Sequence, residues 1–334
     1  MRKPIGQHWQ QVTESEDLLG VDFRSRTFTF AGPKYPTDTT LIHHQGNPDK
    51  KQAILYIHGY TDYFFQAGLA EFFIKQGYRF YAIDLQGYGR SIRPSVRPNW
   101  CESIAQYGQD LNIALATMKK DGIDDVVILA HSTGGLIAST YLAQTQNITE
   151  KEQHYGKAFP TISRLILNSP FLALPLSPNA IRCLSWPIHT LVSLCPFCSL
   201  PANKPTVYAK TLHTSFAGEW DYRLDWKPSE GFPLSFHWLK QIITAQRYLA
   251  KQTITLPTLL CHSDNSTIGK EQVEEMRQGD GVLDIHSMQE AAEATFSQLT
   301  TASIPKGYHD LYLSPQPIRE NYLAAIKDWL EKTA

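Results

Sequence analysis

Short apolar runs alternate with longer amphipathic segments along most of this chain. The apolar runs are rich in β-branched residues, and most lack the alternation of a half-exposed strand, which indicates strands buried on both faces. Segments with apolar residues at helical spacing separate these runs, a pattern typical of a parallel sheet with crossover helices. The pattern predicts about eight strands, at residues 23–30, 39–44, 53–58, 80–85, 126–130, 165–168, 259–261 and 301–304.

The first two runs are separated by a turn rich in glycine and proline, so we expect them to form an antiparallel hairpin. The alternation stops only between residues 171 and 250, where prolines and tryptophans replace the strand pattern. Helices are predicted at residues 64–75, 104–120, 135–143, 288–299 and 317–332.

Composition excludes several classes of protein. The 334 residues include 31 Lys+Arg and 32 Asp+Glu, a formal charge of −1, with 19% charged and 42% apolar residues. A nucleic-acid-binding protein needs a basic face, so near-neutrality argues against that class and equally against an acidic disordered chain. The length allows one large domain or two of ordinary size.

We expect no targeting signal and no membrane anchor in this chain. No apolar run follows Arg2 and Lys3, so we expect no secretory signal. Residues 165–203 are nearly uncharged, but they contain six prolines and therefore cannot form a single membrane-spanning helix. Five cysteines, an odd number, suit a reducing compartment and predict a cytoplasmic protein. Cys195-Pro-Phe-Cys198 looks like a redox motif, but it follows no strand, and we expect no functional thiol pair there.

The strongest local signal for chemistry surrounds Ser132. The β-branched run 126–130 leads directly into His131-Ser-Thr-Gly-Gly135 and then an apolar helix, which is the strand–serine–helix context of a nucleophile elbow. Gly134 is small, as this turn requires, and Ala130 stands where the motif G-x-S-x-G has glycine. At a helix N-terminus the helix dipole favours the negative charge that develops when the serine reacts. The Thr133 N–H can donate to the resulting oxyanion. The alternative is a plain serine N-cap; we favour the nucleophile.

A second oxyanion donor is expected upstream. The strand at residues 53–58 ends in His58-Gly59, and the glycine allows a tight turn that aims the Tyr60 N–H into the site. We interpret the His58 side chain as structural. Asp84 and Arg90 belong to a glycine-containing loop without a following helix, and we expect them to hold that loop rather than to catalyse.

These motifs, His58-Gly59, Asp84-Leu-Gln-Gly-Tyr-Gly-Arg-Ser91 and His131-Ser-Thr-Gly-Gly135, together resemble an α/β-hydrolase. The branch is the serine aminopeptidase S33-like one, which includes monoacylglycerol lipases and lysophospholipases, and the resemblance covers nearly the whole chain. Within it, Gly218-Glu-Trp-Asp221 and Gly279-Asp-Gly-Val-Leu-Asp284 resemble a bacterial subgroup. The resemblance implies an α/β-hydrolase fold, with a mostly parallel sheet flanked by helices, and hydrolase chemistry.

The family order is serine, acid, histidine. His309 lies in a loop after the last predicted strand and before the final helix, where it would act as general base. For the acid we favour Asp280, because Val282, Leu283 and a capping-box helix start at residues 287–290 follow it. Asp264 is nearer the strand end and remains the alternative, with Asp284 a third.

The resemblance also implies a cap after the sixth strand. We place it at residues 173–251, inserted in a body made of residues 1–172 and 252–334. Residues 184–194 contain no Lys, Arg, Asp or Glu and are apolar almost all round. A roof of this kind suits an ester with a hydrocarbon chain, at about 0.8 kcal/mol per buried CH₂. The same residues would equally serve to pack the cap on the body.

The sequence therefore predicts a serine hydrolase that cleaves monoacylglycerol-like or lysophospholipid-like esters through an acyl-enzyme. One alternative is a small-peptide hydrolase, which needs an acidic pocket for the substrate amine; another is a non-catalytic ligand-binding homologue. The expected partner is a small-molecule ester, with no nucleic acid, stable membrane anchor, metal or cofactor, since no metal-ligand spacing occurs. The oligomeric state is left open.

Overall fold

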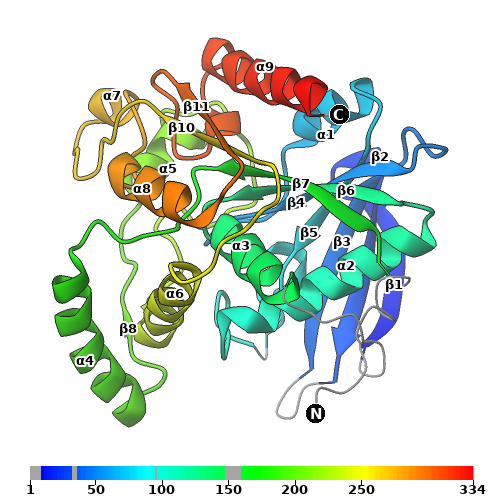
Figure 1. The fold of residues 1–334 in the computed structure, drawn as a ribbon. Helices are drawn as coiled ribbons and strands as arrows, with labels where there is room; N and C mark the ends of the chain where they lie inside the picture. The colour runs from blue at the N-terminus through cyan, green and yellow to red at the C-terminus, as the bar shows by residue number, and fades with distance from the viewer. Residues whose placement is uncertain (1–8, 32–35, 95, 147–158, 334) are drawn as a thin grey trace.

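A nine-stranded sheet forms the centre of the molecule (Figure 1). The computed structural model describes residues 9–31, 36–94, 96–146 and 159–333. The strand order is β1-β2-β3-β5-β4-β6-β7-β10-β11. The strands are β1 (Trp9–Asp17), β2 (Gly20–Phe30), β3 (Thr37–His44), β4 (Gln52–Ile57), β5 (Arg79–Asp84), β6 (Asp125–His131), β7 (Thr161–Asn168), β10 (Thr258–Ser263) and β11 (Leu299–Ile304).

The sheet is mostly parallel, as predicted. β1, β2 and β3 pair antiparallel, and β3 is antiparallel to β5, whereas every neighbouring pair from β5 across to β11 is parallel. The expected hairpin is confirmed, because Phe23 pairs with His44 and Phe30 with Thr37. The carboxyl ends of the parallel strands therefore meet at one edge, where ligands bind in open α/β sheets.

Helices cover both faces of the sheet, since successive side chains of a strand point to opposite faces. Ala53, Leu55 and Ile57 of β4 belong to one buried cluster with α2 and α3, and Ile54 and Tyr56 belong to the other with α1 and α9. Figure 1 shows α1 and α9 on one side of the sheet and α2 and α3 on the other. The bounds are α1 (Ala67–Lys75), α2 (Gly108–Lys120), α3 (Thr133–Thr145), α8 (Ile285–Thr295) and α9 (Gln316–Lys332), with short 3₁₀ turns η1 (Gly89–Ser91), η2 (Ile104–Tyr107) and η4 (Leu311–Leu313).

Two sequence predictions are corrected here. β1 was not expected, because its polar residues are exposed on both faces of an edge strand and leave no period-two pattern. The predicted helix start at residues 287–290 is wrong: α8 begins at Ile285, and the Asp284 carboxylate caps it by accepting from the Ser287 N–H at 2.9 Å.

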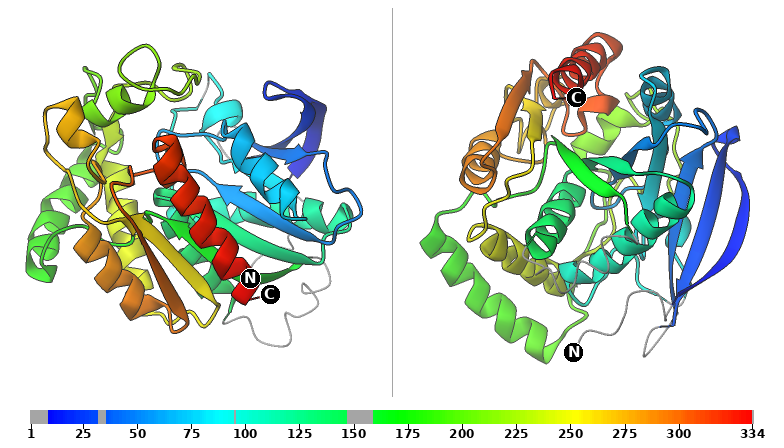
Figure 2. Two further views of the ribbon diagram at one scale, coloured as in Figure 1. Left: turned by 90° about the horizontal axis from the view of Figure 1, so that it is seen from above. Right: turned by 45° about the vertical axis from the view of Figure 1, so that its right-hand side comes forward.

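The segment between β7 and β10 carries the elements outside the regular alternation. They are α4 (Pro178–Leu194), β8 (Ser199–Leu200), α5 (Val207–Leu212), β9 (Leu234–Ser235) and α6 (Phe236–Leu249), and α7 (Val273–Met276) follows β10. α4 packs on α6 through Ile188, Val192 and Ile243, and lies at the periphery in both views of Figure 2.

The apolar stretch of α4 is partly on the surface. Trp186 is 75% exposed and Leu194 is 82% exposed. These two side chains therefore do not form a roof over Ser132. Among the described residues, no helix has both the length and the apolar character needed to cross a bilayer.

The turn after α4 contains a covalent link. Cys195 and Cys198, which we expected to form no functional pair, are joined by a disulfide, while Cys101, Cys183 and Cys261 are free. The cytoplasmic location stays a prediction.

Candidate active site

The predicted functional residues lie at the carboxyl edge of the parallel strands. Ser132 directly follows β6, Tyr60 lies in the loop after β4, and His309 lies in the loop after β11. Asp280 comes from the long connection between β10 and α8. Four separate loops thus converge because their strands are neighbours in one parallel sheet.

Ser132 occupies a strained turn between β6 and α3. Its φ of 53° and ψ of −120° are unusual for a residue with a side chain. The turn is held from both sides, since the Ser132 N–H donates to the Asn168 carbonyl at 3.0 Å and its carbonyl accepts from the Phe171 N–H at 2.9 Å. A Cβ on Gly134 would lie 2.4 Å from the His58 carbonyl oxygen, so only glycine fits there. This is the geometry of a nucleophile elbow.

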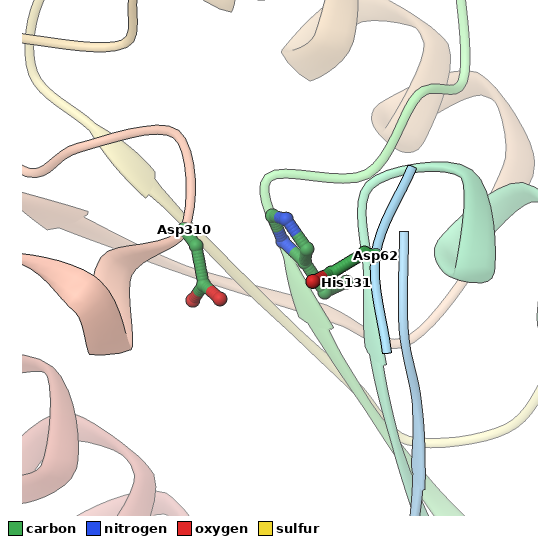
Figure 3. Close-up of side chains that lie close together, drawn as sticks. All are labelled: Asp62, His131 and Asp310. Atoms are coloured by element: carbon green, nitrogen blue, oxygen red, sulfur yellow. The ribbon is translucent and has the colours of Figure 1, made fainter. Parts of the chain in front are cut away.

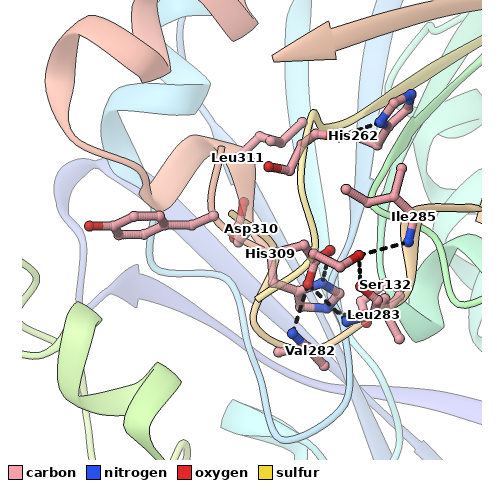
Figure 4. Close-up of polar contacts among 12 residues, drawn as sticks. Ser132, His262, Val282, Leu283, Ile285, His309, Asp310 and Leu311 are labelled. Carbon is pink, nitrogen blue, oxygen red and sulfur yellow. Dashed lines mark hydrogen bonds and ion pairs between the residues drawn. The ribbon is translucent and has the colours of Figure 1, made fainter. Parts of the chain in front are cut away.

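His309 connects the serine to a carboxylate. Its Nε2 lies 2.9 Å from the Ser132 Oγ, and its Nδ1 lies 2.9 Å from the Asp280 Oδ2. Because a carboxylate only accepts, Nδ1 carries the proton and Nε2 is free to accept from the hydroxyl. All three side chains are buried, with exposed fractions of 7% for Ser132, 4% for His309 and 0% for Asp280. Figure 4 shows His309 next to Ser132, with Val282 and Leu283 beside them.

Asp280 is fixed by the backbone around it. Its Oδ1 accepts from the N–H groups of Val282 and Leu283, both at 2.8 Å. Its own N–H donates to the Asn265 carbonyl at 2.8 Å, and its carbonyl accepts from Thr267 at 2.7 Å. Residues 266–279 therefore form an excursion that leaves the end of β10 and returns to it.

The other two candidate acids have different contacts. Asp264 is exposed, and its Oδ1 accepts from the Lys306 N–H at 2.8 Å. Asp284 caps α8. Of the three, the structure brings Asp280 to His309.

Two backbone amides are available near Ser132. The loop of Tyr60 passes close to the serine, since a Cβ on Gly59 would lie 3.0 Å from the Ser132 Cβ. Within the described ranges, neither the Tyr60 N–H nor the Thr133 N–H donates to a protein acceptor. Both groups are free for a ligand oxygen, as an oxyanion hole requires.

The neighbouring glycine-containing loop is held by charge. The Arg90 guanidinium donates to the Asp17 carboxylate twice at 2.7 Å and to Asp84 once at 2.9 Å. Asp84 also accepts from the Phe64 N–H at 2.9 Å, which confirms that Asp84 and Arg90 tie the loop down. His58 is structural as expected: its Nε2 accepts from the Leu85 N–H at 3.1 Å.

Sequence analysis missed the group that supports the His309 loop. The Asp310 carboxylate accepts from the Asn168 side-chain amide at 2.8 Å, and the Asp310 N–H donates to the Tyr208 hydroxyl at 3.0 Å. Tyr208 also lies edge-on to the His309 ring at 5.9 Å. The only available signal was the place of Asp310 directly after His309.

A buried charged cluster lies behind these residues. Asp62, His131 and Asp310 each present one ligand atom, all within 4.8 Å of one another (Figure 3). Lys227 lies 2.6 Å from the Asp62 Oδ1. Burial alone would raise the pKa of Asp62, but Lys227 and the nearby imidazoles lower it below its usual value, whereas burial lowers the pKa of His131. The ammonium already neutralises Asp62, so this cluster is a poor site for a divalent cation.

Comparisons with known proteins agree with this fold. Residues 48–316 match the family model described as serine aminopeptidase, S33. A soluble variant of monoglyceride lipase from Saccharomyces cerevisiae, solved with a substrate analogue, has a TM-score of 0.61 at 16% identity, covering 89% of this chain and 93% of that one. Paleococcus ferrophilus monoacylglycerol lipase has a TM-score of 0.59 at 17% identity, covering 86% and 97%. At these identities the solved structures establish the fold.

One curated relative is similar over a shorter span. Epoxide hydrolase 1 of Caenorhabditis elegans is 32% identical over 109 residues, which is 32% of this chain. The match spans a quarter of that relative's length.

Proposed function

The chain belongs to the serine aminopeptidase S33 family of α/β-hydrolases, and from this premise we propose that it cleaves carboxylic esters through an acyl-enzyme at Ser132. One observation carries the proposal: Ser132, His309 and Asp280 form a continuous line of 2.9 Å contacts that starts at a nucleophile elbow. In this assignment Ser132 is the nucleophile, His309 the base and Asp280 the acid.

The proposed reaction follows from where the protons lie. His309 Nε2 takes the hydroxyl proton as Ser132 Oγ attacks the ester carbonyl carbon, and Asp280 stabilises the resulting imidazolium through Nδ1–H. The imidazolium then gives its proton to the leaving alcohol, which completes the acyl-enzyme. Water, deprotonated by the same Nε2, then attacks the acyl carbon. The bond to Ser132 Oγ breaks, the imidazolium returns its proton to Oγ, and the acid leaves.

The negative charge that develops on the carbonyl oxygen needs donors. We assign this role to the N–H groups of Tyr60 and Thr133, which have no acceptor among the described residues. They are fixed before the reaction by the loop after β4 and by the first turn of α3, so no reorganisation is needed as the charge forms.

The proposed substrate class is an ester with an acyl chain, of the monoacylglycerol or lysophospholipid kind. Support comes from the aromatic side chains that the segment between β7 and β10 brings to the site, such as Trp238, whose ring lies 4.2 Å from that of Tyr60. We propose residues 173–251 as the cap. Two structurally similar proteins are monoglyceride lipases.

Peptide hydrolysis fits the site less well. A substrate amine would need a free carboxylate near Ser132, but Asp62 and Asp310 are buried and engaged with Lys227 and Asn168. The ester proposal is therefore preferred.

A fluorophosphonate probe tests the mechanism. Wild-type protein should be labelled, Ser132→Ala should not, and His309→Ala should be labelled far more slowly because the hydroxyl loses its base. Turnover of p-nitrophenyl esters of increasing chain length, set against aminoacyl anilides, tests the substrate class. Labelling of Ser132→Ala would refute the nucleophile, and faster turnover of anilides would refute the ester assignment.

A further inference from the structure

The Cys195–Cys198 disulfide directly follows α4. Neither cysteine belongs to the proposed catalytic groups, but a series of contacts connects the two cysteines to the loop that contains Tyr60. Cys195 and Cys198 are both half-buried, with Pro196 and Phe197 exposed between them. This C-x-x-C turn, residues 195–198, is a motif whose sulfurs exchange readily with external thiols. Cys183, within α4, is exposed and free.

One line of contacts leads from the C-x-x-C turn through residues 97–100 to the loop of Tyr60 and Thr61, which we call the oxyanion loop. The Phe197 carbonyl accepts from the Arg97 guanidinium at 2.7 Å, and the Phe197 ring lies 6.1 Å from that of Trp100. Between them, the Asn99 side-chain oxygen accepts from both the N–H and the hydroxyl of Thr61, at 3.1 and 2.9 Å. Thr61 directly follows Tyr60.

Thr61 and Asn99 both have positive φ angles, and for the β-branched Thr61 this conformation is unfavourable. Their φ angles are 50° and 56°. A β-branched residue at positive φ persists only where its surroundings fix it. The Asn99 contacts are part of what fixes Thr61, and the oxyanion loop is therefore sensitive to movement of residues 97–100.

A second line reaches Tyr60 from the other side. The Cys198 carbonyl accepts from the N–H of Phe236, the first residue of α6, at 3.1 Å. Ser199 and Ser235 pair in the short β8–β9 ladder. Two residues into α6, the Trp238 ring packs on the Tyr60 ring at 4.2 Å.

We propose that Cys195–Cys198 is a redox modification site, at which a dithiol reductant loosens the turn and displaces the Tyr60 amide from its catalytic position. A thiolate of the dithiol attacks one sulfur, breaks the S–S bond and releases the other cysteine as a thiolate, which takes up a proton. The second thiol of the reductant then attacks the mixed disulfide. Two electrons and two protons pass to the protein, and the reductant leaves as its own disulfide.

The effect on catalysis, which rests on the proposed function, is a fall in kcat rather than a rise in KM for a small ester. The Tyr60 N–H acts on the developing oxyanion, and a small displacement of a catalytic group lowers the rate of the chemical step. The fold itself does not depend on the bond, because a link with a sequence separation of 3 constrains the unfolded chain little.

The test compares oxidised and dithiothreitol-reduced enzyme in three measurements. Alkylation with N-ethylmaleimide and peptide mass spectrometry should find residues 195 and 198 modified only after reduction. Deuterium uptake of the peptide containing Tyr60 and Thr61 should be faster in the reduced enzyme. For p-nitrophenyl acetate, kcat should fall by about tenfold with KM nearly unchanged.

Variants separate this effect from general damage. The double variant Cys195→Ser/Cys198→Ser should show the reduced kcat and no response to dithiothreitol, whereas the matched control Cys183→Ser should respond as wild type does. Alkylation of residues 195 and 198 in the oxidised enzyme, or equal deuterium uptake in the two states, would overturn the inference. So would an unchanged kcat.

Failure of the proposed function gives a different result. If neither redox state hydrolyses esters or reacts with the fluorophosphonate, the function is wrong, and the redox site is judged on alkylation and deuterium uptake alone.

Discussion

Replacing Asp280 by asparagine gives the sharpest test of the proposed mechanism. The Oδ1 atom of Asp280 accepts from two backbone N–H groups at 2.8 Å, and its Oδ2 faces His309 Nδ1 at 2.9 Å. In Asp280→Asn the amide oxygen should keep the two backbone bonds, because an NH₂ group cannot accept them. The NH₂ group then faces Nδ1.

This orientation changes the tautomer of His309. Nδ1 must accept from the new amide, so the ring proton moves to Nε2, which can no longer take the proton of Ser132. Loss of the correct tautomer costs about 10⁴-fold in kcat, or about 5.5 kcal/mol of activation free energy. KM for a short ester should change little, since Asp280 does not touch substrate in the proposed mechanism.

The assay is steady-state hydrolysis of p-nitrophenyl butyrate, with the rate of fluorophosphonate labelling as a second measure of Ser132 reactivity. Thermal unfolding should show that the variant is folded. Asp264→Asn is the matched control, because Asp264 is exposed and its contact is to the Lys306 N–H. We expect it to retain kcat within a few fold. A large loss in Asp264→Asn, with near-normal activity in Asp280→Asn, would refute the assignment.

Three further changes test the surroundings of the site and the stability of the fold. Lys227→Met leaves the buried Asp62 carboxylate unpaired and should lower the free energy of unfolding in urea by about 3–5 kcal/mol. Adding Asp62→Asn to this variant should restore most of the loss. An unchanged free energy of unfolding in Lys227→Met would contradict a stabilising ion pair. Burial is the main cause that lowers the pKa of His43 to about 4, and the charge of Arg26 is the second. The folded protein therefore holds this imidazole neutral at a pH where the unfolded chain protonates it, so the free energy of unfolding falls as the pH drops from 6.5 towards 4. Urea unfolding at pH 7 and at pH 5 should show that the wild-type protein loses about 2 kcal/mol more of its free energy of unfolding between the two pH values than His43→Phe does. Equal losses in the two proteins would contradict this prediction. Gly134→Ala should abolish fluorophosphonate labelling, because its Cβ would lie 2.4 Å from the His58 carbonyl oxygen, whereas in Gly108→Ala the new Cβ lies 3.5 Å from Tyr141 and labelling should persist.

The parts of the fold that the sequence predicts well are those whose environment is uniform. β4 and β6 are buried on both faces, so their apolar runs are continuous and easily recognised. β1 is exposed on both faces and has no pattern to read. α4 contains Pro187, and proline in the sequence argues against a helix although tertiary packing on α6 maintains this one.

The candidate site divides in the same way. Ser132 and His309 could be predicted because their signals are local: a strand, a small-residue turn and a helix in one case, a loop before the last helix in the other. For the acid, the apolar residues that follow Asp280 favour it over Asp264, but the backbone bonds that tie Asp280 to the end of β10 leave no pattern in the sequence. Lys227 and Asp62 are 165 residues apart in the chain, so their contact depends wholly on the tertiary fold.

The backbone bonds that join the two ends of the excursion at residues 266–279 have a consequence for how this hydrolase can diversify. Asn265 and Thr267 bond to the backbone of Asp280, so the proposed acid is tied to the chain that directly follows β10. Arg277, in the excursion, lines a cavity of about 210 Å³ together with Glu219 and Tyr308. Replacement of Arg277 should reshape this cavity while Asp280, the proposed acid, keeps its bonds to Asn265 and Thr267. A lineage, or a protein engineer, can thus vary this wall next to the His309 loop while the proposed catalytic geometry is inherited unchanged.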